Sequence, residues 1–508
     1  MIEKLRYEKL YDSLNQDNKL IHVGLLLERA FKNWPENIAV IADDQSITYQ
    51  ELYYQANLFA KKLLGLGIKK GDRVIILYPN SIDFYIAYFG LWVIGAIAIP
   101  LNTFLIEKEV LKIIEDAEPH CLIIPNDFLD KFKELNNLDI AIVSRVFEKD
   151  ILSIDNVITP ANRDIEDIAA ILYTSGTTGF PKGVMLTSKN IIINAIQGIS
   201  RFESSYKDRI FCPLPLFHAL PQNTCVWATT IMGATAITIS RIDRHAILNG
   251  LKHNPTVIMA VPAIYGLFCK MKSIDFGYIR YFFSGGDVLS DKIRGYFELI
   301  YRRKLCNGYG LTETSPFISV DIDDYTQSTN NIGYLFFGLE CQIRDSNMNI
   351  LDKNQVGILW LKGDNIMKGY YNLPELTQEV LKDGWFNTGD LAYINQDGKI
   401  VLSGREKDLI KSKGIKIYPQ EIENILLTHD KVIQAAVIGK KSSDMDEEYP
   451  VAYIASHTPD QEKLKKELSE LARKNLAAYK LPKNFIIKRE LPLTSTGKVD
   501  KKRLKSEL

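Results

Sequence analysis

Residues 167–183 read DIAAILYTSGTTGFPKG, a short apolar run that leads into a loop rich in glycine and hydroxyl groups. The apolar run predicts a buried β-strand. Backbone N–H groups freed by glycine, the hydroxyls of the loop and the charge of Lys182 can together surround an anion such as phosphate. The loop is not a Walker A motif, because the G-x-x-x-x-G-K-[ST] register does not fit. By itself it leaves two interpretations open, a phosphate-binding loop and an ordinary surface turn.

Apolar runs like this one recur along the chain and alternate with amphipathic segments of helical length. The other predicted strands of this region are Ile38 to Ile41, Arg73 to Tyr78, Cys121 to Ile124 and Thr256 to Val261. Segments 50–66 and 106–116 have the spacing of apolar residues that is typical of helices. This alternation predicts a large α/β unit with mostly parallel sheets.

The composition changes near residue 400. Residues 404–416, GREKDLIKSKGIK, are dense in lysine, and Pro419 beyond them suits the first position of a helix. The rest of the chain predicts strands near 432–438, 450–455 and 484–488, and a helix near 460–478. We therefore expect a large domain over residues 1–404 and a small α+β domain over residues 405–508.

Charge and cysteine content limit the class of protein. Lys plus Arg and Asp plus Glu both number 62 among 508 residues, so no basic excess indicates nucleic acid as a partner. The six cysteines lack a C-x-x-C pair, and the charged start of the chain has no signal-peptide pattern, which together favour a cytoplasmic location. Residues 84–106 carry no charge and are long enough for a membrane span, but their glycines and proline favour a buried helix and strand.

Six further motifs follow the first loop in order. They are PLPLFH (213–218), SGGD (284–287), GYGLTET (308–314), GWFNTGD (384–390), GREKDLIKSKG (404–414) and LPLTSTGK (491–498). With YTSGTTGFPKG, this series resembles the adenylate-forming superfamily of acyl-CoA synthetases, peptide-synthetase adenylation domains and beetle luciferases. The resemblance implies a large domain of mostly parallel α/β sheets with a distorted barrel part, followed by a small mobile α+β domain.

The resemblance also implies an activity. Members activate a carboxylic acid with ATP and Mg²⁺ to an acyl-AMP, and the thiol of coenzyme A then takes the acyl group and releases AMP. Such chemistry needs charge neutralisation and in-line positioning at the α-phosphate, which the motif residues can supply. Residues matched to catalytic positions are Lys498, Thr178, Glu313, His218 and Lys411. Those matched to nucleotide binding are Thr174, Ser175, Gly176, Thr177, Thr178, Lys182, Gly286, Asn307, Gly308, Tyr309, Gly310, Thr312, Asp390, Arg405 and Lys498.

Individual roles follow from the same resemblance. Tyr309 and its neighbouring glycines would pack on the adenine, Asp390 and Arg405 would bind the ribose, and Lys498 would bridge the substrate carboxylate and the α-phosphate. Glu313 and Thr178 would hold Mg²⁺, a hard cation that prefers oxygen ligands. Thr312 would contact phosphate. Lys407 matches the hinge between the domains, and Lys411, Lys413 and Gly414 match the channel for coenzyme A.

The identity of the acid depends on Phe217 and His218. Amino-acid adenylation domains have an aspartate there, whereas a histidine resembles acyl- and aryl-acid synthetases. The stretches GYGLTETSP (308–316) and YYNLPELT (370–377) are most similar to medium- or long-chain fatty acyl-CoA synthetases. This resemblance implies a medium- or long-chain fatty acid, with an apolar channel near Trp227, Ile231, Met232, Gly285 and Gly286. The segment ALPQN after His218, and Asp287, depart from the common pattern in this pocket. Contact with a membrane surface and the oligomeric state stay open.

Three alternatives compete with a fatty acyl-CoA synthetase. An acyl-AMP ligase that loads a carrier protein often has an extra insertion in the large domain, which this length does not indicate. A ligase for an aryl acid or another short acid would use the same chemistry. A non-catalytic nucleotide-binding protein is disfavoured, because Glu313, Asp390, Arg405 and Lys498 are all present.

Overall fold

The strand of the opening motif lies in the middle of a seven-stranded sheet. In the computed structural model, β9 (Ile168–Thr174) runs antiparallel to β10 (Lys182–Thr187), so the two strands bracket the glycine-rich loop. The order is β20 (Gly369–Tyr370), β10, β9, β6 (Ile97–Pro100), β5 (Arg73–Ile76), β7 (Cys121–Ile123) and β8 (Ala141–Val143). The structure describes residues 2–16, 19–147, 157–174, 181–271, 274–322, 330–412, 415–441, 448–493 and 499–508.

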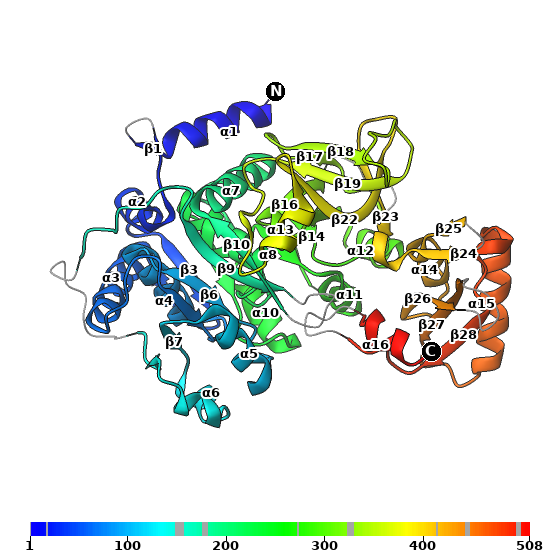
Figure 1. The fold of residues 1–508 in the computed structure, drawn as a ribbon, viewed down its shortest axis with the longest axis horizontal. Coiled ribbons are helices and arrows are strands. Elements are labelled where there is room, and N and C mark those ends of the chain that lie inside the picture. The colour runs from blue at the N-terminus through cyan, green and yellow to red at the C-terminus, as the bar shows by residue number, and fades with distance from the viewer. Residues whose placement is uncertain are drawn as a thin grey trace.

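A nine-stranded sheet lies next to the first one (Figure 1). Its order is β17 (Tyr334–Leu335), β16 (Phe317–Asp321), β15 (Leu305–Gly310), β14 (Tyr281–Ser284), β13 (Val257–Ala260), β11 (Arg209–Phe211), β12 (Thr235–Thr238), β3 (Ile38–Ala42) and β4 (Gln45–Thr48). Its inner strands are parallel, and β16, β17 and β4 add antiparallel edges. The predicted α/β class with mostly parallel sheets is confirmed.

Helices cover these sheets, and α4 (Ile82–Ile94) is the most buried of the long ones. Ser81 caps its first turn by accepting a hydrogen bond from the backbone N–H of Phe84, and Gly95 ends it with a left-handed φ of 78°. The chain then enters β6, so the uncharged stretch at 84–106 begins with a buried helix and strand, as predicted. Among the described residues, no helix is long and apolar enough to cross a membrane.

The other helices of this part connect the strands. They are α1 (Ile2–Ser13), α2 (Leu26–Asn33), α3 (Tyr49–Gly65), α5 (Glu107–Ala117), α6 (Asn126–Leu129), α7 (Ser188–Phe202), α8 (Ala219–Gln222), the π-helical turn η4 (Asn223–Trp227), α9 (Ala228–Met232), α10 (Arg244–Lys252), α11 (Pro262–Lys270), α12 (Asp291–Tyr301) and α13 (Pro374–Val380). The first strands, β1 (Asn15–Gln16) and β2 (Lys19–Leu20), form a short hairpin.

A five-stranded antiparallel sheet follows and corresponds to the distorted barrel part that the resemblance implies. It contains β18 (Glu340–Arg344), β19 (Gly357–Lys362), β21 (Leu381–Lys382), β22 (Trp385–Ile394) and β23 (Ile400–Arg405). Together with the two larger sheets it forms what we call the large lobe, the described residues up to Arg405.

The described residues from Ile410 onward form a C-terminal lobe with a core of its own, which Figure 1 shows beside the large lobe. It contains β24 (Ile410–Ser412), β25 (Ile415–Ile417), α14 (Pro419–Leu427), β26 (Gln434–Lys441), β27 (Glu448–Ala455), α15 (Gln461–Asn475), β28 (Asn484–Lys488) and α16 (Lys501–Ser506). Pro419 begins α14, as the sequence predicts. The apolar core changes between Leu402 and Ile410, and the boundary at 404/405 itself stays a prediction.

Candidate active site

Asp390 is the centre of a buried polar cluster in the large lobe. The antiparallel register of β22 and β23 places Asp390 opposite Arg405, and Nε of Arg405 lies 3.0 Å from Oδ1 of Asp390. The hydroxyl of Tyr309, at the end of β15, donates to Oδ2 of the same carboxylate. Since Asp390 is only 4% exposed, its charge is balanced mainly by these two groups. Three residues that the sequence places in separate motifs therefore meet.

The turn before Asp390 explains its position. Oδ1 of Asn387 accepts a hydrogen bond of 2.9 Å from the N–H of Gly389, and Oγ1 of Thr388 accepts one of 3.1 Å from the N–H of Asp390. Gly389 has a φ of 67°, which suits glycine. The sequence NTGD thus bends within β22 and directs the carboxylate toward Tyr309.

The Asp390 carboxylate raises the pKa values of both neighbouring groups, Tyr309 and Arg405. Burial, and then the carboxylate of Asp390, raise the pKa of the Tyr309 hydroxyl well above its usual value. The Asp390 carboxylate raises the pKa of the Arg405 guanidinium, to which Glu313 contributes more weakly. Tyr309 therefore stays protonated and donates its hydrogen bond to Asp390, whose carboxylate oxygens can also accept hydrogen bonds from sugar hydroxyls.

A second cluster joins Glu313 to the lysine of the opening motif. Oε1 of Glu313 accepts a hydrogen bond of 2.8 Å from the hydroxyl of Tyr370, and Nζ of Lys182 lies 5.1 Å from the centre of the Tyr370 ring. The pairing of β10 with β20 sets Tyr370 opposite Val184 and so beside Lys182. Sequence analysis did not identify Tyr370. The one available signal was its place in the family-like wording YYNLPELT, which gives no partner.

Glycines of the SGGD and GYGLTET motifs allow neighbouring groups to pack directly against the backbone. A Cβ at Gly310 would lie 1.8 Å from the carbonyl oxygen of Pro316, so no other residue fits there without movement. A Cβ at Gly308 would lie 2.0 Å from the ring of Phe283, and one at Gly285 would lie 2.7 Å from the same ring. The ring of Phe283 therefore packs directly against the backbone of Gly285 and Gly308. Gly286 has a φ of 80°, which favours glycine for backbone reasons.

Phe283 belongs to a group of buried rings. Its ring centre lies 5.3 Å from that of Phe317 and 5.7 Å from that of Phe202, both nearly perpendicular to it. Such edge-to-face packing is favourable and holds the rings in defined positions. The region beside Gly285 and Gly308 is consequently bounded by aromatic surface.

His218 directly precedes α8 and lies beside Phe217, with ring centres 4.3 Å apart. The loop that precedes it is held by Asn80, whose side chain accepts from the N–H of Leu216 at 2.7 Å and donates to the carbonyl of Leu214 at 2.8 Å. Asn80 is a positioning residue that sequence analysis missed, because it is more than a hundred residues away in the chain. The expected channel residues Trp227, Ile231 and Met232 are buried in the core of the large lobe.

The other residues expected at the site fall into three groups. Asn307 is buried and donates to the carbonyl of Asn331 at 3.2 Å, Thr174 ends β9, and Thr312 begins a short 3-10 turn. Lys407 is exposed in the 3-10 turn Glu406–Asp408 that leads to the C-terminal lobe. Outside the described residues or side chains lie Ser175, Gly176, Thr177, Thr178, Lys411, Lys413, Gly414 and Lys498.

The two clusters offer what a nucleotide needs. A buried carboxylate beside a phenol and a guanidinium can accept hydrogen bonds from sugar hydroxyls, and Glu313 offers oxygen to a hard cation. The part of the chain that the structure describes contains no group of three or more His, Cys, Asp or Glu arranged as a metal site. A cation bound by Glu313 would therefore need oxygen atoms from other sources, such as the phosphates of ATP.

Comparison with known proteins supports this geometry. Residues 27–371 match the model of the family described as AMP-binding enzyme, and residues 421–498 match its C-terminal domain. The chain belongs to the AMP-binding enzyme family. Its relatives include the peroxisomal OPC-8:0-CoA ligase 1 of Arabidopsis thaliana, which is 31% identical over 91% of this chain and 88% of the relative. The long-chain-fatty-acid–CoA ligase of Yersinia pestis is 29% identical over 95% and 93%, and 4-coumarate–CoA ligase 3 of A. thaliana is 29% identical over 91% and 87%.

Solved structures of this AMP-binding family have the same fold. ATP-bound MatB from Rhodopseudomonas palustris superposes with a TM-score of 0.85 at 25% identity, covering 96% of this chain and 99% of that one. The apo form of the same enzyme superposes with a TM-score of 0.78 at 26% identity over the same shares. As a member of the adenylate-forming group, this protein is an ATP-dependent acid–thiol ligase with coenzyme A as co-substrate.

Proposed function

We propose that this ligase is an Mg²⁺-dependent fatty acyl-CoA synthetase. In the first half-reaction a carboxylate oxygen of the acid bonds to the α-phosphorus of ATP and pyrophosphate leaves. In the second, the sulfur of coenzyme A, having lost its proton, bonds to the acyl carbon and AMP leaves. The observation that carries the proposal is the meeting of Tyr309, Arg405 and the buried Asp390, three residues from separate motifs, in one nucleotide-sized cluster.

Each described residue has a role that its surroundings support. Asp390 accepts hydrogen bonds from the ribose hydroxyls, and Arg405, 3.0 Å away, holds that carboxylate in place. Tyr309 presents its ring to the adenine while its hydroxyl is tied to Asp390. Tyr370 orients Glu313, and Lys182 adds positive charge beside it.

The residues around Glu313 fit a magnesium ion. Its carboxylate is a suitable ligand for a hard cation and is held by the Tyr370 hydroxyl at 2.8 Å, so its direction is fixed. We assign Mg²⁺ to Glu313, with Thr178 as a further ligand. Bound Mg²⁺ supplies neutralisation of phosphate charge, while the protein residues bind and orient the nucleotide.

The two half-reactions require two positions of the C-terminal lobe. We propose Lys498 as the residue that bridges carboxylate and α-phosphate, and Lys411, with Lys413 and Gly414, as residues of the thiol channel. Lys407 is proposed as the hinge. It is exposed, so its backbone can turn while its ammonium stays in water.

The acid side of the proposal rests on absence of charge and on aromatic surface. Phe217 and His218 occupy the position where an ammonium partner would stand, and burying an unpaired ammonium is costly. The rings of Phe283 and Phe317 pack together beside Gly285 and Gly308. These features support a fatty acid. Because the same rings can pack against a flat ring, and because 4-coumarate–CoA ligases are among the relatives, an aryl acid is the second candidate.

Acid-dependent exchange of radiolabelled pyrophosphate into ATP tests the proposal. Saturated acids of increasing length, a cinnamic-type acid, a benzoate and an amino acid would be compared, each with Mg²⁺ and without coenzyme A. We expect exchange to rise with chain length, since each buried methylene contributes about 0.8 kcal/mol, and acyl-CoA to form once coenzyme A is added. Preference for an aromatic acid over every fatty acid would transfer the proposal to the second candidate, and exchange with none of the acids would refute both.

A further inference from the structure

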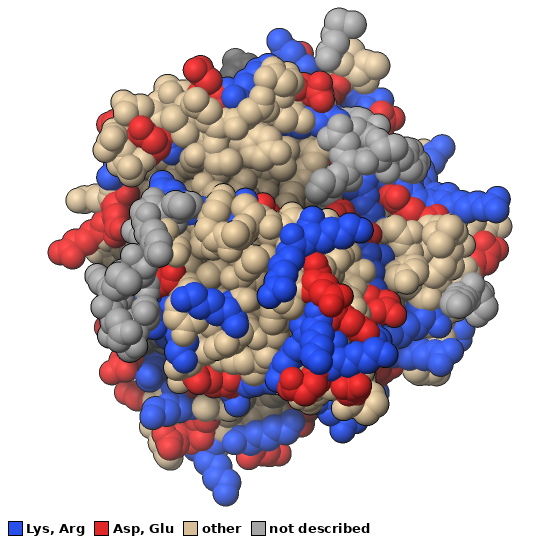
Figure 2. Space-filling model, turned by 90° about the vertical axis from the view of Figure 1, so that its right-hand side faces the viewer, with Lys and Arg blue, Asp and Glu red and all other residues tan. Residues whose placement is uncertain are grey.

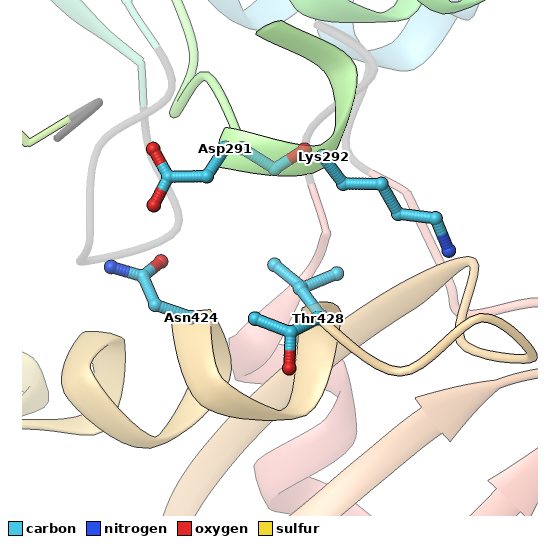
Figure 3. Close-up of a pocket in the computed structure, with 6 residues that line it drawn as sticks. Asp291, Lys292, Asn424 and Thr428 are labelled. Carbon is cyan, nitrogen blue, oxygen red and sulfur yellow. The ribbon is translucent and has the colours of Figure 1, made fainter. Parts of the chain in front are cut away.

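Lys292 of the large lobe forms hydrogen bonds with the turn that follows α14, the first helix of the C-terminal lobe. Lys292 lies in α12, and its Nζ donates to the backbone carbonyls of His429 at 3.2 Å, Asp430 at 3.1 Å and Val432 at 3.1 Å. Figure 3 shows its side chain extended from α12 toward the turn that follows α14. The three carbonyls lie just beyond α14, in the turn that leads to β26, and an ammonium forms charge-assisted hydrogen bonds with them.

A further hydrogen bond joins the two lobes near Lys292. Asn424, on α14, donates to Oδ1 of Asn330 at 3.2 Å. Between α12 and α14 the two lobes leave a small crevice lined by Ser290, Asp291, Lys292, Asn424, Leu427 and Thr428, four of which Figure 3 labels. Lys292 thus contributes three charge-assisted hydrogen bonds to the contact between the lobes at this position.

The charged side chains around the turn are engaged with one another. Glu467 on α15 is already engaged by Lys431, at 2.7 Å, and lies 3.4 Å from Nε2 of His429. Figure 2 shows Lys and Arg intermingled with Asp and Glu over the face that the C-terminal lobe presents. Removing a lysine elsewhere on this surface changes the net charge but keeps the hydrogen bonds of Lys292. An experiment can therefore separate the effect of charge from the effect of these bonds.

The same helix α14 is also tied to α16, the first described helix after Lys498 in the sequence. Glu423 of α14 forms an ion pair of 2.7 Å with Lys501 of α16, which is three residues beyond Lys498. The same Glu423 carboxylate accepts the N–H of Val437 in β26 at 2.7 Å, so α14, α16 and the sheet form one unit. Contacts that hold α14 against the large lobe therefore also position Lys501 and α16, which follow Lys498 in the sequence.

We propose that Lys292 is a positioning residue that holds the C-terminal lobe in the orientation used for acyl-AMP formation and that releases it before the thiol step. This inference rests on the proposed function. The whole chain superposes on ATP-bound MatB with a TM-score of 0.85 and on apo MatB with a TM-score of 0.78. Rotation of the lobe carries the three carbonyls away together, and the ammonium returns to water, so the two orientations stay close in free energy.

The test compares the two half-reactions in variants of the whole chain. Lys292→Met keeps the length of the side chain but removes the charge and the donors. We expect its pyrophosphate exchange to fall about tenfold, as for the loss of hydrogen bonds to a charged group, while conversion of supplied acyl-AMP to acyl-CoA is unchanged or faster. Lys292→Arg should restore part of the exchange, and Asn424→Ala should act in the same direction as Lys292→Met but more weakly.

Lys465→Met is the matched control, because Lys465 bonds Glu462 of its own helix and its removal takes the same charge from the molecule. It should leave both half-reactions unchanged. Equal losses in both half-reactions for Lys292→Met, or no loss of exchange, would overturn the proposal. If wild-type protein shows no exchange with any acid, the proposed function fails, and amide hydrogen exchange still tests the contact: Lys292→Met should speed exchange of the amides at 428–433, and unchanged rates would overturn the contact.

Discussion

The nucleotide side and the acid side that we propose for the site differ in the contacts that form them. On the nucleotide side, Asp390 is surrounded by polar groups that are already paired with it, Tyr309 and Arg405. On the acid side, the ring of Phe283 lies directly on the backbone of Gly285 and Gly308. The first side offers fixed hydrogen bonds, whereas the second offers a volume that one side chain can change. We infer that the chemistry depends on the nucleotide side and the choice of acid on the other.

The largest expected effect is that of Asp390→Ala, which removes the centre of the nucleotide side. It leaves Arg405 and Tyr309 without their common acceptor and removes the proposed acceptor of the ribose hydroxyls, and since hydrogen bonds to a charged group contribute about 1.5 to 3 kcal/mol each, exchange should fall by about 10² or more. The loss should be the same for every acid. Asp397→Ala, in an exposed turn, is the control and should be active. A loss that depends on chain length would mean that the two sides are not separate.

A smaller effect is expected for Tyr370→Phe, which removes the hydroxyl that orients Glu313 but keeps the ring beside Lys182. One hydrogen bond to a charged group is lost, so the Mg²⁺ concentration for half-maximal exchange should rise about tenfold. Titration of exchange with MgCl₂ measures this directly. Tyr371→Phe provides a neighbouring control with the same chemical change. An unaltered Mg²⁺ requirement in Tyr370→Phe would remove Glu313 from the metal site.

The smallest effect should be that of Phe283→Leu, confined to the acid side. A leucine leaves part of the space above Gly285 and Gly308 open, and each added methylene that fills it gains about 0.8 kcal/mol. The preferred acid should therefore become longer, while the KM for ATP stays constant. Phe282→Leu changes the adjacent residue, which packs in a different core, and should keep the wild-type order of acids. If Phe283→Leu changes the KM for ATP and Phe282→Leu does not, the nucleotide side and the acid side are not independent.

The sequence predicted the strands and the first helix of the C-terminal lobe well, because their signals are local. The apolar run at 169–173 and Pro419 each indicate an element without reference to the rest of the chain. The motifs also identified Tyr309, Asp390 and Arg405, which the structure brings into contact.

Contacts between distant residues could not be predicted in this way. Tyr370 reaches Glu313 because two strands pair, and Asn80 holds the loop before His218 from another sheet. The ring of Phe283 reads in the sequence as one more buried residue of a strand, and only its seat on two glycines gives it a place in the site. Lys292 carries no motif, since its acceptors are backbone carbonyls that any sequence provides.

The most direct test of the central proposal, one site that serves two half-reactions through movement of the C-terminal lobe, is to measure both half-reactions in Lys498→Ala and Lys411→Ala. Our account predicts that Lys498→Ala lowers acid-dependent pyrophosphate exchange by about 10² or more while supplied acyl-AMP is still converted to acyl-CoA, and that Lys411→Ala does the reverse. Equal losses in both half-reactions for both variants would contradict it.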